Sequence, residues 1–358
     1  MPSLKEIKGR INSISSTLAI TSAMKMVAAA KLQKAQMAIQ NMLPYERRLY
    51  SMLVDLMGAM NISAAASEDG SVRGSGSAER GFDQSGDRLS LSNRHDLAGM
   101  DGAYSLMAQR EVRKVAIVAF ASNSSLCGAF NSNAIREATA VINEYRASGL
   151  RDSDIVVYSV GRKMAEAMRK LGFPSPADFT KMSDSPSYEA ASALAQELLD
   201  GFVSGRFDKV ELVYNHYKST SSQPTTRQTY LPLSLADATA DLQAGKIADS
   251  ASESDTNRGA EPVGAPVVRQ GSPTTEDLIV EPSKEALIAT LLPKVIRLRI
   301  FTTLLDSAAA EQAARTVAMQ LATDNGNDLL QELTLEYNKG RQQKITSEIL
   351  DLVGGSMQ

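Results

Sequence analysis

The chain of 358 residues has no tryptophan, few aromatic residues (5%), two histidines and a single cysteine, Cys127. One cysteine cannot form an internal disulfide bond, so a disulfide-stabilised secreted domain is excluded, and a reducing interior such as a bacterial cytoplasm fits best. Aromatic side chains supply much of the bulk of large globular cores, and their scarcity favours a thin or helical architecture. No run of about 18 apolar residues is present, so we expect no direct membrane span.

Charge and missing motifs exclude further classes. The formal net charge of −3 lacks the basic excess that phosphate neutralisation needs, so we expect no nucleic-acid partner. Neither His95 nor His216 has a partner at metal-ligand spacing, and no glycine-rich phosphate loop follows a predicted strand. Cys127 follows a predicted strand without an evident base, which favours a structural turn at 125–128 over a nucleophile. We therefore expect no catalytic, cofactor-binding or metal-binding residues, and no cofactor.

Residues 1–60 predict one long helix that pairs with another helix. Positions spaced alternately three and four residues apart are apolar in ten of twelve cases. These positions are Leu4, Ile7, Ile11, Ile14, Leu18, Thr21, Lys25, Ala28, Leu32, Ala35, Ile39 and Met42. Such spacing over several heptads is the seam of a coiled coil. Pro44 is expected to bend this N-terminal coiled-coil helix.

The middle of the chain predicts an α/β globular domain at 111–235 between two low-complexity insertions, 61–110 and 236–279. The insertions are rich in small, polar or proline residues and lack periodicity. Within the domain we expect strands at 115–120, 155–160, 209–217 and 226–233 and helices near 133–147, 162–171 and 188–202. Strands alternating with helices predict a Rossmann-like domain with a mostly parallel sheet.

The last segment, 280–358, predicts a C-terminal coiled-coil helix. No single heptad frame fits its whole length, and Pro293 and Gly326 interrupt the pattern. Two long helices at opposite ends of a chain predict an antiparallel pair with the α/β domain at its side. The expected fold class is therefore α/β, with a long antiparallel coiled coil of the N- and C-terminal helices plus a Rossmann-like domain.

Two features of the N-terminal helix indicate contacts with other chains. Residues 1–50 carry eight basic and two acidic side chains, which fits either a solvated coiled-coil surface or a face for acidic partner loops. The stretch from Met24 to Leu32 has few bulky groups, so this section of the helix is slim on all sides. A slim section suits a close-fitting sleeve, although alanine is also simply a good helix former.

Motifs at both ends of the chain resemble those of the gamma subunits of rotary ATP synthases. The N-terminal one is Ile-Thr-Ser-Ala-Met-Lys-Met-Val-Ala-Ala-Ala-Lys at 20–31. The stretch Ser-Leu-Cys-Gly-Ala-Phe-Asn at 125–131 is similar to the family's turn after its first strand. The C-terminal ones are Gln-Ala-Ala-Arg at 312–315, Ala-Met at 318–319, Ala-Thr-Asp-Asn-Gly at 322–326 and the run 333–349, which includes Tyr-Asn-Lys-Gly-Arg-Gln at 337–342 and Ile-Thr at 345–346. The chain departs from the family pattern at Ala19 and Ser22, where lysines are common, and at Ser125, which replaces a glycine.

The resemblance implies a central rotor shaft of bacterial type that is not itself catalytic. It implies that the coiled coil stands inside a hexamer of alpha and beta subunits and that six residues contact this hexamer: Met24, Lys25, Arg341, Gln342, Thr346 and Glu348. It further implies that the α/β domain meets the epsilon subunit and the membrane c ring at the cytoplasmic face of the bacterial inner membrane. Proton- or sodium-driven rotation of the c ring would then drive ATP synthesis, with ATP and Mg²⁺ bound by the partners.

Two other classes stay open at the level of sequence. An unrelated coiled-coil scaffold would explain the helices and the basic face, but not the motifs at both ends. An α/β enzyme with helical arms would need a catalytic constellation, and the sequence nominates none.

Overall fold

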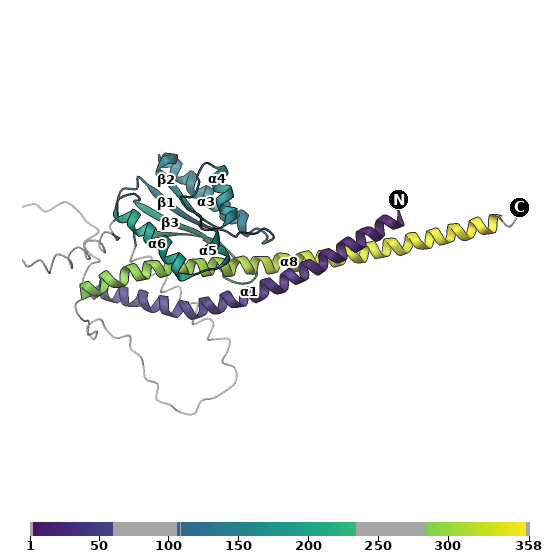
Figure 1. Cartoon of the computed structure of the whole chain (residues 1–358), viewed down its shortest axis with the longest axis horizontal. Helices are drawn as coiled ribbons and strands as arrows, with labels where there is room; N and C mark the ends of the chain where they lie inside the picture. The colour runs from purple at the N-terminus through teal and green to yellow at the C-terminus, as the bar shows by residue number, and fades with distance from the viewer. Residues whose placement is uncertain (1–2, 60–105, 108, 234–283, 356–358) are drawn as a thin grey trace, which may run out of the picture.

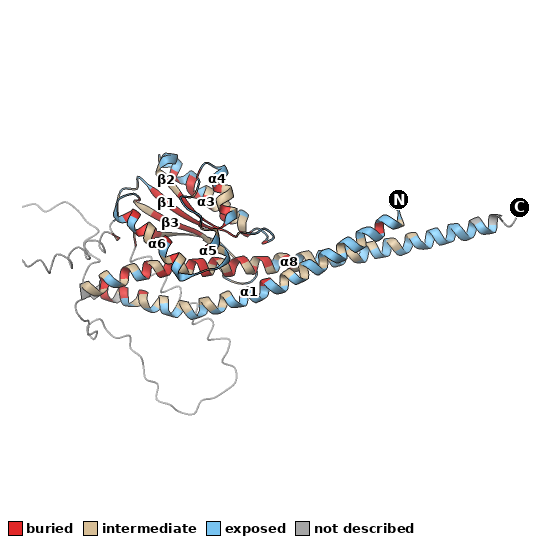
Figure 2. Cartoon of the chain, in the orientation of Figure 1, coloured by how far each residue is buried: buried red, intermediate tan, exposed pale blue. Residues whose placement is uncertain are grey.

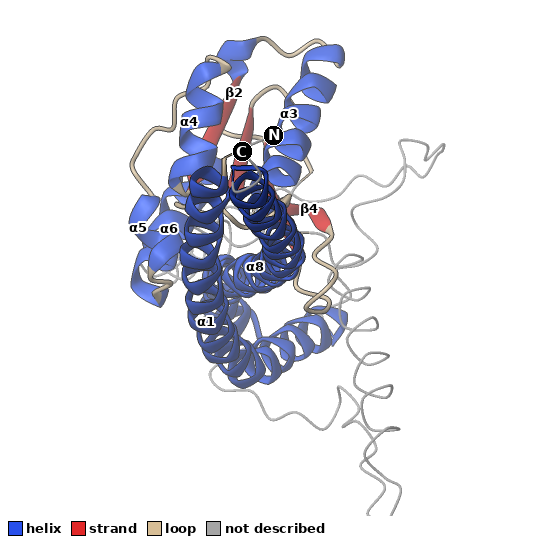
Figure 3. Ribbon diagram, turned by 90° about the vertical axis from the view of Figure 1, so that its right-hand side faces the viewer, coloured by secondary structure: helices blue, strands red, loops and turns tan. Residues whose placement is uncertain are grey.

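A computed structural model of the chain describes residues 3–59, 106–107, 109–233 and 284–355. The predicted insertion 236–279 lies outside the described residues, as does 61–110 except for 106, 107, 109 and 110. The rest consists of two very long helices and one α/β domain that lies to one side of them (Figures 1 and 3).

The two terminal helices form the predicted antiparallel coiled coil. Helix α1 (Leu4–Ala59) has 56 residues and α8 (Lys284–Gly355) has 72, and they run side by side in opposite directions (Figure 1). At 1.5 Å per residue, α8 is roughly 110 Å long. Pro44 lies inside α1 and Pro293 inside α8, so each helix continues past the proline that interrupts its sequence pattern.

The predicted seam of α1 is confirmed, because each of its twelve positions from Leu4 to Met42 is buried or half-buried. Two contacts fix the antiparallel register of α1 against α8. The hydroxyl of Thr323 donates a hydrogen bond to that of Thr21 at 3.2 Å, and Leu18 packs directly over Gly326. Gly326, which breaks the sequence pattern, is thus the point where a leucine of α1 approaches the backbone of α8.

Helix α8 changes partners along its length, which explains why no single heptad frame fits it. From Ile288 to Leu304 its buried side chains join the core beneath the sheet. Ala309 and Ala313 then pack against Leu32 of α1. Beyond Ala318, α8 faces α1 without the α/β domain, and its exposed fraction rises toward the C-terminus (Figure 2).

Replacing Gly326 by leucine should lower the free energy of unfolding by about 1–3 kcal/mol, because the new side chain overpacks the contact with Leu18. Even a Cβ atom at Gly326 would lie 2.6 Å from Leu18 Cδ2. Gly9 of α1 is a matched control, since a Cβ there meets no atom within 4 Å. Gly9→Leu should stabilise the helix by up to about 1 kcal/mol. Denaturant unfolding of both variants decides the matter, and equal effects would contradict the close approach at Gly326.

The α/β domain is built on one four-stranded sheet with the order β2-β1-β3-β4. Its strands are β1 (Val115–Phe120), β2 (Ile155–Val160), β3 (Lys209–Asn215) and β4 (Thr225–Leu231). Strand β1 pairs parallel with β2 and β3, and β4 pairs antiparallel with β3, so the predicted mostly parallel sheet is confirmed. The helices are α3 (Phe130–Ala147), α4 (Arg162–Lys170), α5 (Thr180–Asp184) and α6 (Tyr188–Val203), with a 3₁₀ turn at Asp152–Asp154.

The two faces of the sheet contact different partners because successive side chains of a strand alternate in direction. Val115, Ile117 and Ala119 of β1 face a core shared with α3 and α4. Ala116 and Val118 face the larger core, which contains α6, the end of α1 and the first part of α8. The sheet therefore packs directly on the coiled coil. Within the described residues, no helix is both long enough and apolar enough to cross a lipid bilayer.

Candidate functional site

The C-terminal tip of α8 extends past α1. Gly340 lies beside Leu4, at the described start of α1, and a Cβ at Gly340 would be 3.1 Å from Leu4 Cδ2. Residues 341–355 therefore continue for about 22 Å beyond this pairing, as the free end of α8 in Figure 1 shows. Every residue from 341 to 350 is exposed.

Four of the six predicted contact residues lie on this tip, and all four are exposed. The hydroxyl of Thr346 donates to the backbone oxygen of Gln342 at 2.9 Å. Glu348 pairs with Lys344 at 3.8 Å, and both side chains are about two-thirds exposed, so this ion pair contributes less than about 1 kcal/mol. No contact described for Arg341, Gln342 or Glu348 competes strongly with a partner chain.

Apolar side chains share the tip with these polar ones. Ile345, Ile349 and Leu352 are exposed by 48%, 54% and 74%. Exposed apolar groups along one helical segment typically mark a surface that another protein covers. The tip thus presents apolar and hydrogen-bonding groups together.

Met24 and Lys25, the other two predicted contact residues, are half-buried, while the neighbouring Met26 and Val27 are exposed by 65% and 57%. Because Thr21 pairs with Thr323, Lys25 lies roughly 30 Å along the coiled coil from the tip. The structure therefore separates the six residues into two contact regions. In the slim stretch, the exposed apolar side chains belong to Met26 and Val27 rather than to Met24.

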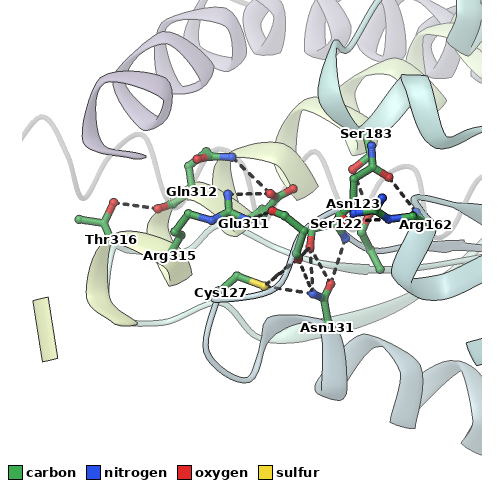
Figure 4. A network of polar contacts seen from close by, with 12 residues as sticks. Ser122, Asn123, Cys127, Asn131, Arg162, Ser183, Glu311, Gln312, Arg315 and Thr316 are labelled. Carbon is green, nitrogen blue, oxygen red and sulfur yellow. Dashed lines mark hydrogen bonds and ion pairs between the residues drawn. The ribbon is translucent and has the colours of Figure 1, made fainter. Parts of the chain in front are cut away.

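The turn after β1 holds its conformation through internal hydrogen bonds. Cys127 is buried, and its sulfur accepts a hydrogen bond from Asn131 Nδ2 at 3.1 Å (Figure 4). Asn131 Nδ2 also donates to the oxygen of Ser124, and its Oδ1 accepts from the amide of Ser122 at 3.0 Å. Leu126 has a φ of 68°, which strains a non-glycine residue. The prediction of a structural turn at 125–128 is confirmed.

This turn contacts α8 through a buried ion pair. Arg315 Nη1 binds Glu311 Oε1 at 2.8 Å, and both side chains are 10% exposed. Arg315 Nη2 donates to the hydroxyl of Ser124 at 2.6 Å, so the same guanidinium joins α8 to the turn (Figure 4). Burial raises the pKa of Glu311, and Arg315 opposes that rise by favouring the charged carboxylate. Gln312–Arg315, a run that the sequence analysis used only for resemblance, is thus part of a specific contact.

The segment after β3 contacts the same helix from another side. The backbone amide of Tyr217 donates to Asp306 Oδ1 at 2.9 Å, and Asp306 Oδ2 binds His216 Nδ1 at 2.6 Å. Gln36 of α1 donates to the hydroxyl of Tyr217 at 2.6 Å. Sequence analysis missed these residues, because the partners lie about 90 and 181 positions apart and no local spacing connects them. We call residues 121–129, His216, Tyr217 and residues 306–315 of α8 the joint.

Helix α8 occupies the place where open α/β sheets hold ligands. Such ligands bind outside the carboxyl ends of strands where the strand order reverses, which here lies between β1 and β3. At this point Cys127 and Phe130 pack against Ala310, with Tyr217 and Ala314 beside them. The Rossmann-like domain therefore uses its customary ligand crevice to bind a helix of its own chain.

The His216–Asp306 pair should make stability depend on pH. The hydrogen bond and charge of Asp306 raise the pKa of His216, while burial and Lys218 oppose the rise. A raised pKa gives stability that is complete below the unfolded pKa of about 6.5 and is lost as pH rises through the higher folded value. We expect His216→Asn to lower the melting temperature more at about pH 6 than at about pH 9. Because His216 is half-exposed, the loss should stay below about 1 kcal/mol, and a larger loss at high pH would contradict the pairing.

Comparison with known proteins places the whole chain in one family. Residues 3–357 match the family model described as ATP synthase. The chain is 46% identical over 357 residues to the ATP synthase gamma chain of Phocaeicola vulgatus and 44% identical over 358 residues to that of Bacteroides thetaiotaomicron, covering 100% of each chain. It is 35% identical to the gamma chain of Flavobacterium johnsoniae over 99% of this chain and 98% of that one.

The fold is shared with solved rotor structures. The chain resembles a subunit of the Euglena gracilis mitochondrial ATP synthase, in the structure of its OSCP/F1/c-ring in rotational state 3, with a TM-score of 0.52 and 18% identity over 99% of this chain and 93% of that one. A second structure, of the rotor of the same enzyme, gives a TM-score of 0.51 and 18% identity over 96% and 98% of the two chains. Full-length similarity to one family also removes the unrelated scaffold and the enzyme with helical arms. The chain therefore belongs to the ATP synthase gamma-chain family, as the non-catalytic central shaft of that rotary enzyme.

Proposed function

We propose that the tip of α8 and the Met24–Lys25 region of α1 contact the alpha and beta subunits of the catalytic hexamer. The observation that carries this is the tip itself, a stretch of about 22 Å beyond the described part of α1 with exposed apolar and polar side chains. A hexamer that encloses the tip would cover Ile345, Ile349 and Leu352. Arg341, Gln342, Thr346 and Glu348 would then hydrogen-bond to its inner surface.

The α/β domain then faces the membrane sector in this proposal. It contacts the epsilon subunit and the c ring, at the cytoplasmic face of the bacterial inner membrane. The low-complexity segments 61–110 and 236–279 separate the shaft helices 1–60 and 280–358 from the domain 111–235. Rotation of the c ring, driven by protons or sodium ions, turns the domain and with it the coiled coil.

The asymmetry of the shaft couples its rotation to the reaction in the catalytic subunits. Each orientation of α1 and α8 makes different contacts with the three catalytic subunits, and so favours a different nucleotide affinity in each of them. This chain supplies the orientation alone, while nucleotide, Mg²⁺ and catalytic groups belong to the partners. The role therefore needs a stiff rod and a defined surface rather than an active site.

Replacing Gln342, Thr346 and Glu348 together by alanine tests the tip contact. Alanine preserves the helix, and each lost hydrogen bond to a partner is worth about 0.5–1.5 kcal/mol. We expect the dissociation constant of the shaft in the hexamer to rise about tenfold or more, or steady-state ATP turnover to fall by a similar factor. Both are measured on the reconstituted complex of this chain with alpha and beta subunits.

A matched control has the same residue types on the paired part of α8. Gln331, Thr334 and Glu336 are exposed like the three tip residues, and Thr334 makes the same backward bond, to Leu330 O at 2.7 Å. Their replacement by alanine should leave turnover and retention within about twofold of the unmodified complex. Unchanged behaviour of the tip variant would assign Gln342, Thr346 and Glu348 to a solvated surface.

A further inference from the structure

The joint holds α8 at two opposite margins of one helical face. With about 100° per residue, Ala310 and Ala314 project about 40° and 80° from Asp306, and Arg315 about 180° from it. Asp306 is bound by the segment after β3 and Arg315 by the turn after β1. Two polar anchors thus flank a strip of alanines.

The alanine strip alone resists rolling of α8 poorly. Ala310 is fully buried against Cys127 and Phe130, so the helix and the domain approach closely. Methyl groups, however, interdigitate little, and a helix can roll over them with a small loss of contact. Directional hydrogen bonds at both margins oppose rolling in both senses.

Each anchor is itself held in place. Asp306 accepts two hydrogen bonds, from the amide of Tyr217 and from His216. Glu311 binds one nitrogen of Arg315 and so orients the other toward Ser124. The hydroxyl of Tyr217 also accepts a hydrogen bond from Gln36, so the joint contacts α1 as well.

We propose that the joint is a second connection, beyond the core beneath the sheet at Ile288–Leu304, through which torque passes between the α/β domain and the coiled coil. In this proposal Asp306 and Arg315 are the positioning residues that lock the roll of α8. The inference rests on the proposed function, in which the membrane ring turns the domain and the hexamer resists the coiled coil. The core beneath the sheet holds α8 only as far as Leu304. Under load, a joint without its anchors lets α8 roll beyond that point, and rotation of one part no longer turns the other fully.

The test is the double variant Ser124→Ala and Asp306→Ala in the complete complex, reconstituted into vesicles. It removes the partner of Arg315 on the turn and the acceptor for Tyr217, yet leaves the buried Glu311–Arg315 pair intact. We expect ATP hydrolysis within about twofold of the unmodified complex and a ratio of ion pumping to hydrolysis lowered about threefold or more, since slippage changes coupling and not the catalytic sites.

The matched control is Ser125→Ala with Asp328→Ala. These are an exposed serine of the same turn and an exposed aspartate of α8, and the described residues show no hydrogen bond or ion pair of either across the joint. This control and the unmodified complex should pump with the same ratio. If neither the control variant nor the unmodified complex pumps ions, the result contradicts the proposed function and not the role of the joint.

A reversible cross-link tests the slip directly. A Cβ at Gly128 would lie 3.7 Å from Ala318 Cβ, within the range of disulfide bonds. Gly128→Cys and Ala318→Cys, added to the double variant with Cys127→Ala, should restore the pumping ratio on oxidation and lose it again on reduction. The reduced form carries the same backbone strain at Gly128, whose φ is +57°, so it is the proper reference. An unchanged ratio in the double variant, a cross-link without effect, or loss of the subunit from the complex would each overturn the proposal.

Discussion

Replacing Arg315 by methionine should lower the free energy of unfolding by about 3–5 kcal/mol at neutral pH, because it leaves the charge of Glu311 buried without its partner. Glu311 and Arg315 are each only 10% exposed, so water can hydrate neither group well. The remaining hydrogen bond to Glu311, from Gln312 at 3.4 Å, is too long to compensate. Denaturant unfolding of the purified chain measures the loss.

The pH dependence of this loss identifies its cause. Burial already raises the pKa of Glu311, and Arg315 opposes that rise. In the variant the folded pKa should rise further, so stability is fully retained below the unfolded pKa of about 4.3 and is lost as pH rises through the folded value. The gap to the unmodified chain should therefore widen between about pH 5 and about pH 8.

The double variant Glu311→Leu and Arg315→Met separates charge from packing. Removing both members of a buried ion pair is often neutral or stabilising, so most of the lost stability should return. If the double variant were as unstable as Arg315→Met alone, the loss would come from packing or from the Ser124 contact.

The sequence predicted a helix or strand well where the surroundings of that element stay the same along its whole length. The apolar runs Val115–Phe120 and Ile155–Val160 are both strands with the predicted bounds, because both are covered on two faces. The spacing of apolar residues predicted the buried seam of α1 equally well, since one helix, α8, accompanies it throughout. Helix α5, with five residues, escaped prediction because so short a segment has no measurable period.

Strand ends depended on contacts that no local pattern contains. The third strand was predicted to reach Tyr217, but β3 ends at Asn215, because the amide of Tyr217 bonds Asp306 of α8 instead of a neighbouring strand. The fourth was predicted to reach Leu233, but β4 ends at Leu231, and the following proline has no amide hydrogen for the ladder. Both corrections concern residues that leave the sheet.

The same distinction between local pattern and distant contact holds for the candidate sites. The contact role of the α8 tip was predicted from the family motif at 333–349, and the structure adds that the tip is exposed and that no described part of α1 accompanies it. The joint could not be anticipated, because its residues come from three distant segments and their chemistry is ordinary in each. A lone histidine, an aspartate in a helix and a tyrosine after a strand acquire a role only when the fold brings them together.

Replacing Tyr230 by alanine should lower the free energy of unfolding by about 3–5 kcal/mol, the usual cost of removing a large aromatic ring from a core. Tyr230 is 1% exposed, and its hydroxyl donates to the backbone oxygen of Ile296 in α8 at 2.9 Å. It stands near the end of β4, where residues 225–229 are only half-buried. Together with Leu231, which is fully buried in the same core, the ring therefore attaches this edge strand to the helix beneath the sheet.

Two further variants divide this effect into its parts. Tyr230→Phe keeps the ring and removes one hydrogen bond, so it should cost about 0.5–1.5 kcal/mol. Thr226→Ala, at a half-buried position of the same strand, should cost less than about 1 kcal/mol. Denaturant unfolding of the three variants should therefore rank Tyr230→Ala well above the other two. A loss in Tyr230→Phe equal to that in Tyr230→Ala would instead make the hydrogen bond to Ile296, and not the packing of the ring, the link between β4 and α8.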